Sequence, residues 1–128
     1  MTFEKTLPLA PLRRRVDLLV MDWPGLVPKR MFGTDAWFVN GNIFAIIDTT
    51  PPRVGVKLTE AARFGAALKL KGAKPFAPGD EPMRHWVVLP STQCESEDAL
   101  EPWLREAYLA AALLTPKAMK NRGRAWLD

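Results

Sequence analysis

The dipeptide Asn40-Gly41 constrains the fold of this chain more than any other feature. It separates an aromatic run over residues 37–39 from an apolar run over residues 43–47. Asn-Gly is the preferred pair for a two-residue hairpin turn, because both turn positions require positive φ. Further on, Val54 and Val56 alternate with Gly55 and Lys57, which predicts a third strand with one polar face. The sequence therefore predicts three adjacent antiparallel strands.

Helical patterns lie on both sides of these strands. Residues 11–20 place apolar side chains at helical spacing, and the Trp23-Pro24-Gly25 segment ends this pattern. A second helix is expected after Thr59, which we predict as its N-cap, and it should end near residues 71–72.

The last helix has an acidic start, with Ser96 as the candidate N-cap, and should end near residues 114–116. Pro102 is expected either as its first helical residue or after a short turn over residues 97–100. An apolar stripe of this helix is predicted to face the core; it comprises Leu100, Trp103, Leu104, Ala107, Ala111 and Leu114.

Two short strands are predicted between the second and third helices, over residues 74–76 and 83–89. The order is then α-β(3)-α-β(2)-α. Strands in runs with segregated helices favour an α+β domain in which helices pack on an antiparallel sheet. A length of 128 residues is that of one domain. We divide the chain into a loose lead-in over residues 1–10, a domain over residues 11–116, and a basic tail over residues 117–128.

Several short segments resemble, in the same order, those of the TfoX/Sxy N-terminal domain family, which is related to the MmcQ/YjbR-like proteins. They span about two-thirds of the chain: Lys29 to Gly33, Phe38 to Ala45, Gly72 to Phe76, Pro82 to Arg84, Trp86 to Pro90, Ala99-Leu100, Trp103-Leu104, Ala107 and Thr115 to Lys117. The resemblance implies a YjbR-like, secretion-chaperone-like fold. Longer relatives add a C-terminal domain and regulate natural competence genes, whereas this chain resembles the single-domain members, whose biochemical activity is not established. Thr34-Asp35-Ala36 stands where members often have a second glycine.

The composition indicates the kind of cellular compartment in which the protein is expected. Cys94 is the single cysteine, so no intrachain disulfide forms, and no apolar run approaches the roughly 20 residues of a membrane helix. No secretory signal pattern is present, and we expect a cytoplasmic protein without membrane contact.

The chain has a net charge of +4, and its lysine and arginine residues gather in clusters over residues 13–15, 69–74 and 117–124. A solvated basic surface is the favoured interpretation, and direct binding of nucleic acid is the alternative.

No assembled catalytic motif is recognisable. His85 is the only histidine, and Cys94, Ser91 and Thr92 follow without a nucleophile signature. One histidine and one cysteine do not suffice for a zinc site, and no phosphate-binding glycine loop occurs. We therefore predict no catalytic residue, no metal and no cofactor. His85 is expected in a strand, pointing opposite to Arg84 and Trp86.

The aromatic residues are expected to form the core, and a candidate partner or ligand surface is carried by basic side chains: Arg30, Arg53, Lys57, Arg84 and His85. If Trp37 and Phe38 both lie in one strand, one of them faces away from the helices. A helix, a loop or a second subunit must then cover it, which is our argument for self-association.

Three functions are carried forward. The first is a non-enzymatic binding or regulatory domain, linked to transcription through protein–protein contacts. The second is direct nucleic-acid binding through the basic clusters. The third, less favoured, is a small-ligand or enzyme site near Arg84 and His85.

Overall fold

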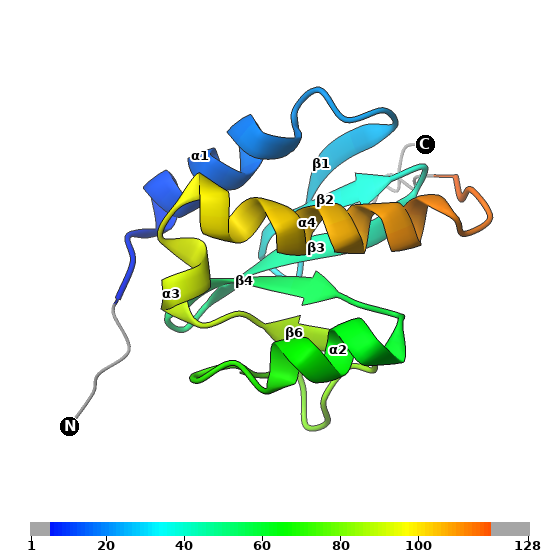
Figure 1. The fold of residues 1–128 in the computed structure, drawn as a ribbon. Helices are drawn as coiled ribbons and strands as arrows, with labels where there is room; N and C mark the ends of the chain where they lie inside the picture. Colours follow the sequence, from blue (N-terminus) through cyan, green and yellow to red (C-terminus); the bar gives the residue numbers. More distant parts are fainter. Residues whose placement is uncertain (1–5, 119–128) are drawn as a thin grey trace.

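The computed structural model describes residues 6–118 and places them around one six-stranded antiparallel sheet (Figure 1). The strand order is β1-β2-β3-β4-β6-β5. The elements in chain order are α1 (Leu9–Val20), β1 (Leu26–Met31), β2 (Thr34–Val39), β3 (Asn42–Thr49), β4 (Pro52–Lys57), α2 (Ala61–Leu68), β5 (Lys74–Pro75), β6 (Trp86–Val88), α3 (Ser91–Cys94) and α4 (Glu97–Ala112).

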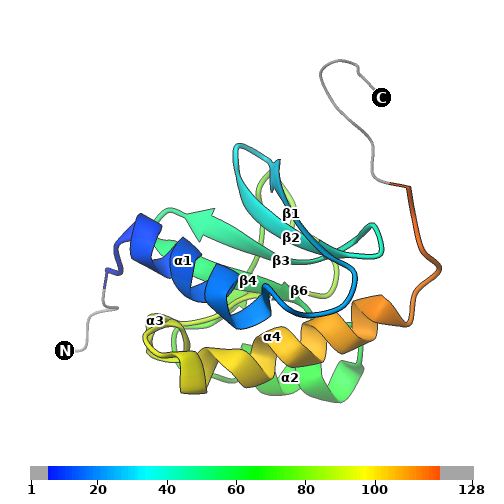
Figure 2. The same ribbon diagram turned by 90° about the horizontal axis from the view of Figure 1, so that it is seen from above.

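The helices cover one face of the sheet (Figure 2). α1 and α4 pack next to each other and bury their apolar stripes against strand residues such as Trp37, Phe44 and Val54. On α1 the stripe is Leu12, Val16 and Val20, spaced four residues apart, so that all three lie on one side of the helix. This larger core holds the helical layer in place.

The opposite face of the sheet has its own, smaller core. Because side chains alternate along a strand, Trp37 points to the helices and Phe38 points to this second face. Phe38 and Ile46 pack there with Phe76 and Trp86, whose ring centroids are 5.7 Å apart. Phe76 belongs to the segment between β5 and β6, so the chain itself buries the outward aromatic residue. A second subunit is not needed for that purpose.

The α+β class and its antiparallel sheet packed by helices are confirmed, but there are six strands where five were expected. β1 is the additional one. It pairs only with β2, most of its side chains are exposed, and Pro28 is tolerated because the strand lies at the sheet edge. It therefore lacks the alternating pattern that identifies a half-buried strand. The short helix α3 is also additional.

Several local expectations are corrected. Glu60, not Thr59, is the N-cap of α2, and no side chain caps that helix. Ser96 is the N-cap of α4 as predicted, and its hydroxyl accepts a hydrogen bond from the Ala99 N–H at 3.1 Å. Both expectations for Pro102 are wrong, because α4 runs unbroken through it. Pro102 is exposed, so water can reach the carbonyl that its missing N–H leaves free.

The predicted strand over residues 83–89 is also shorter than expected. β6 begins only at Trp86, because His85 has a φ of 72° and breaks the extended chain.

Both ends of the described region contact the rest of the fold. α1 begins at Leu9, and Leu7 is already buried in the larger core. Of the predicted tail, residues 119–128 lie outside the described residues. Lys117 is held in place, since its N–H donates to the carbonyl of Asn40 at 2.8 Å. Among the residues described, no helix has the length and apolar character needed to cross a membrane.

Candidate functional site

The predicted surface residues divide into two groups. Lys57 lies opposite Trp86 in the β4–β6 pairing, and Arg84 and His85 directly precede β6. The Leu58 N–H donates to the carbonyl of His85 at 2.8 Å, which ties this loop to the end of β4. Three of the five residues therefore lie near one end of β4.

Arg84 and His85, but not Lys57, line a cavity of about 460 Å³, which we call the His85 cavity. Its lining is largely apolar: Thr59, Ala61, Phe64, Pro75, Pro82, Met83, Arg84, His85 and Trp86. His85 is half-buried, and its ring meets Phe64 edge-on with centroids 6.2 Å apart. Apolar walls with an adjacent guanidinium and imidazole suit a small ligand that combines an apolar body with an acidic group.

The other two predicted residues serve the fold. Arg53 is buried and donates a hydrogen bond to the carbonyl of Gly72 at 3.1 Å, which holds the turn before β5. Arg30 lies on the opposite sheet edge from β5, where its guanidinium bonds the Gly33 carbonyl and lies 3.6 Å from Asp35. The five residues do not form one continuous surface.

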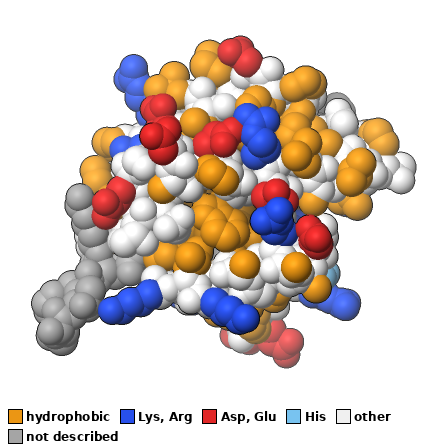
Figure 3. Space-filling model, in the orientation of Figure 1, with side chains coloured by type: hydrophobic (Ala, Val, Ile, Leu, Met, Phe, Trp, Pro, Cys, Tyr) orange, Lys and Arg blue, Asp and Glu red, His pale blue; other side chains and the backbone are white. Residues whose placement is uncertain are grey.

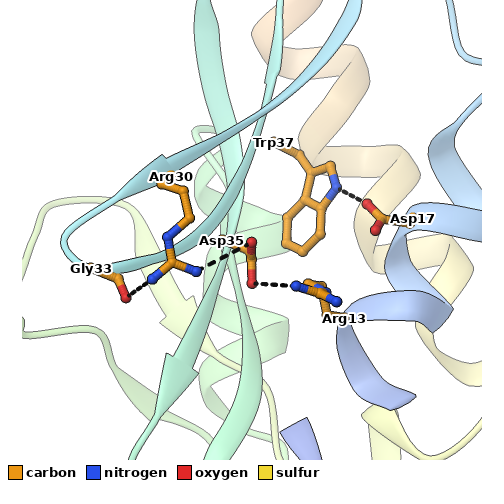
Figure 4. A network of polar contacts seen from close by, with 6 residues as sticks. All are labelled: Arg13, Asp17, Arg30, Gly33, Asp35 and Trp37. Carbon is orange, nitrogen blue, oxygen red and sulfur yellow. Dashed lines mark hydrogen bonds and ion pairs between the residues drawn. The ribbon is translucent and has the colours of Figure 1, made fainter. Parts of the chain in front are cut away.

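Arg30 is part of a network that fastens α1 to the sheet (Figure 4). The Trp37 indole N–H donates to Asp17 at 2.8 Å, and Arg13 lies 3.9 Å from Asp35. Asp17 and Arg13 come from α1, whereas Trp37 and Asp35 come from β2. These contacts give a structural role to Arg13, which the sequence analysis placed in a solvated basic cluster.

The basic clusters point in different directions. Arg13 meets Asp35 on the helical side of the sheet, and Arg15 donates to the carbonyl of Cys94 at 2.9 Å. Lys74 lies 3.9 Å from Asp48, which alternates onto the opposite side of β3 from the larger core. The third cluster falls mainly outside the described residues. The first two clusters thus lie on opposite sides of the sheet.

The thiol of Cys94 lies in the larger core, away from the His85 cavity. It is fully buried and accepts a hydrogen bond from the Val54 N–H at 3.5 Å. Cys94 lies beside Val54 near the start of β4, whereas His85 is bonded to Leu58 just beyond its end, so the two do not form a nucleophile–base pair. Within residues 6–118, no three acidic, histidine or cysteine side chains are grouped as a metal site requires.

Sequence reasoning missed a second hollow, the α2–α4 groove, on the helical face. It has a volume of about 420 Å³ and is lined by Leu58, Thr59, Glu60, Arg63, Glu106, Leu109, Ala110, Leu113 and Leu114. Leu109 is 51% exposed and Leu113 is 89% exposed. Figure 3 shows hydrophobic side chains on this face around small groups of acidic and basic ones. The sequence feature that could have indicated this groove is the four-residue spacing of Leu109 and Leu113, which lie outside the buried stripe of α4.

Leu114 was predicted to be part of that buried stripe, and the structure instead exposes it at the end of the groove. The other members of the predicted stripe are buried or half-buried. α4 ends at Ala112, so the helical periodicity that placed Leu114 on the core side no longer applies to it.

The fold defines a class: an α+β domain with helices packed on one face of an antiparallel sheet. Comparison with family models gives the specific assignment. The model of the TfoX N-terminal domain matches residues 19–111, and the chain belongs to that family. Comparison with curated proteins gave no significant match. Family membership supports a regulatory or binding domain in general terms.

Proposed function

We propose that this chain is a non-enzymatic regulatory domain that binds another protein through the α2–α4 groove, with its link to transcription made through that partner. The observation that carries the proposal is the pair of exposed leucines that line the groove, Leu109 on α4 and Leu113 at its C-cap, where the backbone is still in the right-handed helical region. Exposed apolar side chains rimmed by charges are typical of protein contact sites. Leucines four residues apart present one continuous apolar strip.

The charges around the groove suggest the chemistry of the partner. Arg63 lies 3.5 Å from Glu106 and 3.9 Å from Glu60, so two carboxylates share one guanidinium. The rim therefore keeps a net negative charge. The partner that fits is an amphipathic helix whose apolar stripe is flanked by lysine or arginine, bound as a helix in a groove.

The test compares two substitutions at residues of equal exposure. Leu109→Glu changes the groove, and Leu18→Glu changes α1 at a residue that is also 51% exposed. Tagged wild type and both variants are used to capture partners from the cells of origin, with and without nuclease. The captured protein is then purified and titrated against each form.

We expect nuclease-resistant capture by wild type and by the Leu18 variant, and affinity at least about tenfold weaker for the Leu109 variant. Capture that disappears with nuclease would favour direct nucleic-acid binding, as would affinity that falls steeply with salt. Equal affinity for all three forms would remove the groove from the proposal.

A second candidate function is binding of a small acidic ligand in the His85 cavity. Its support is the placement of the Arg84 and His85 side chains beside apolar walls in one hollow. Because His85 is the only histidine of the chain, its imidazole signals in an NMR spectrum are unambiguous. Titration with aromatic and aliphatic carboxylates should shift those signals, and Arg84→Gln should weaken the effect. Unchanged imidazole signals for all carboxylates would eliminate this candidate.

A further inference from the structure

A separate cavity of about 510 Å³, the Phe32 cavity, opens on the side of the sheet away from the helices. It forms where the turn between β1 and β2, the end of β3 and the chain around β5 approach one another. Its lining is Phe32, Thr34, Ile47, Asp48, Thr49, Thr50, Lys74, Pro75, Phe76, Ala77 and Pro78. Its size is that of small-molecule sites, which usually combine apolar walls with a few converging polar groups.

Phe32 is placed unusually at this cavity. It has a φ of 55° and is 59% exposed. Together with Gly33, at a φ of 74°, it forms the two-residue turn between β1 and β2. A phenylalanine in the left-handed region is strained, and this position of the turn normally holds asparagine, aspartate or glycine. Burial does not repay that strain here, since most of the ring faces solvent. Strain kept at an exposed aromatic residue points to a contact with a ligand.

Charges of both signs lie in the same cavity. The Lys74 ammonium is 3.9 Å from the Asp48 carboxylate, which is the outer limit of an ion pair. Thr34, Thr49 and Thr50 add polar side chains beside them. A ligand that carries both an ammonium and a carboxylate can satisfy this pair, each group with its opposite. A phosphate would instead meet the carboxylate of Asp48 as a like charge.

We propose that the Phe32 cavity binds a free aromatic amino acid. Its ring stacks on Phe32 and lies against Pro75 and Phe76, its ammonium bonds Asp48, and its carboxylate bonds Lys74. Stacking on an aromatic ring adds affinity beyond the area buried. This inference does not depend on the α2–α4 groove, which lies on the helical face of the sheet.

The primary test is an NMR titration of the full, isotope-labelled chain with L-tryptophan. We expect saturable shifts of the backbone amides of Thr34, of residues 48–50 and of residues 74–77 that carry an N–H. Three analogues each remove one recognised group: indole-3-propionate lacks the ammonium, tryptamine lacks the carboxylate, and L-leucine lacks the ring. Each should bind at least about tenfold more weakly than tryptophan.

Two variants separate binding from folding. Phe32→Asn removes the ring and supplies a residue that the turn prefers, so binding should weaken at least about tenfold while the melting temperature stays within a few degrees of wild type. Met21→Asn is the control, since Met21 is 61% exposed near the end of α1 and does not line this cavity; its affinity should equal that of wild type.

The proposal is overturned if tryptophan, phenylalanine and tyrosine all leave the spectrum unchanged at millimolar concentration. It is also overturned if leucine binds as tightly as tryptophan, or if Phe32→Asn binds tryptophan normally. None of these results bears on capture of a protein at Leu109, so the failure of one proposal is distinct from the failure of the other.

Discussion

Two hairpin turns of the same sheet have the same backbone form and very different surroundings. The turn between β1 and β2 is Phe32-Gly33, and the turn between β2 and β3 is Asn40-Gly41. All four residues have positive φ, between 51° and 82°, as a type I′ turn requires. Asparagine and glycine suit that geometry, whereas phenylalanine does not.

The second turn is enclosed by the rest of the chain. A Cβ on Gly41 would lie 1.9 Å from the carbonyl oxygen of Lys117, and a Cβ on Gly25 would lie 2.4 Å from the side-chain oxygen of Asn40. Nothing lies within 4 Å of a Cβ built on Gly33. One turn is therefore built for folding, with favourable residues and close packing. The Phe32-Gly33 turn has an unfavourable residue and little packing around Gly33, which is consistent with the proposed role of Phe32 in ligand binding.

The largest expected effect is at the enclosed turn. Gly41→Ala would combine left-handed strain with a collision against the Lys117 backbone, and it would disturb the hydrogen bond from the Lys117 N–H to Asn40. We expect a loss of about 3 kcal/mol in the free energy of unfolding. Urea denaturation measures it. A loss below about 1 kcal/mol would show that the chain near Lys117 does not constrain this turn.

The next effect exchanges the residue types of the two turns. Asn40→Phe places an aromatic residue at a φ of 51°, where asparagine is well tolerated and phenylalanine is strained. The free energy of unfolding should fall by about 1–2 kcal/mol. The same denaturation experiment applies, with Asn40→Asp as the control, since aspartate also tolerates this region. If the phenylalanine variant is as stable as wild type, a left-handed phenylalanine costs little in this sheet, and the φ of Phe32 no longer supports a ligand contact.

A smaller effect is expected at the open turn. Gly33→Ala meets no neighbouring atom, so its cost is the left-handed conformation alone, about 1 kcal/mol. The comparison with Gly41→Ala isolates the contribution of packing, since the φ values of the two glycines differ by little. Equal losses at the two glycines would contradict the contrast between an enclosed and an open turn.

The same contrast explains what the sequence could predict of the fold. The hairpin at Asn40-Gly41 was predictable because the turn residues themselves identify it. Strand β1 was not, because its hairpin turns at Phe32, a residue that does not indicate a turn. Ser96 was recognisable as a cap from local chemistry alone, whereas Pro102 was placed wrongly because an exposed position in the helix tolerates it.

The candidate sites were less predictable, since they depend on pairing and on packing between elements. The proximity of Lys57 to Arg84 and His85 follows from the β4–β6 register, which no local pattern specifies. The same holds for the burial of Arg53, whose partner is the carbonyl of Gly72. The exposure of Leu109 depends on where α2 lies beside α4, and helical periodicity alone cannot distinguish a groove from a core.

The smallest effect, and the one that most sharpens the comparison, is expected for the stability of Phe32→Asn. Relief of left-handed strain contributes about 1 kcal/mol in favour of the variant, and the loss of the mostly exposed ring costs less than that. With 59% of Phe32 already exposed, we expect the free energy of unfolding to change by less than about 1 kcal/mol in either direction. Urea denaturation beside Asn40→Phe measures the difference. A loss above about 2 kcal/mol would identify Phe32 as a packing residue, because contact with the chain itself would then repay its strain. A neutral result means that folding does not require the ring, and its retention at the mouth of a cavity then needs an explanation in binding.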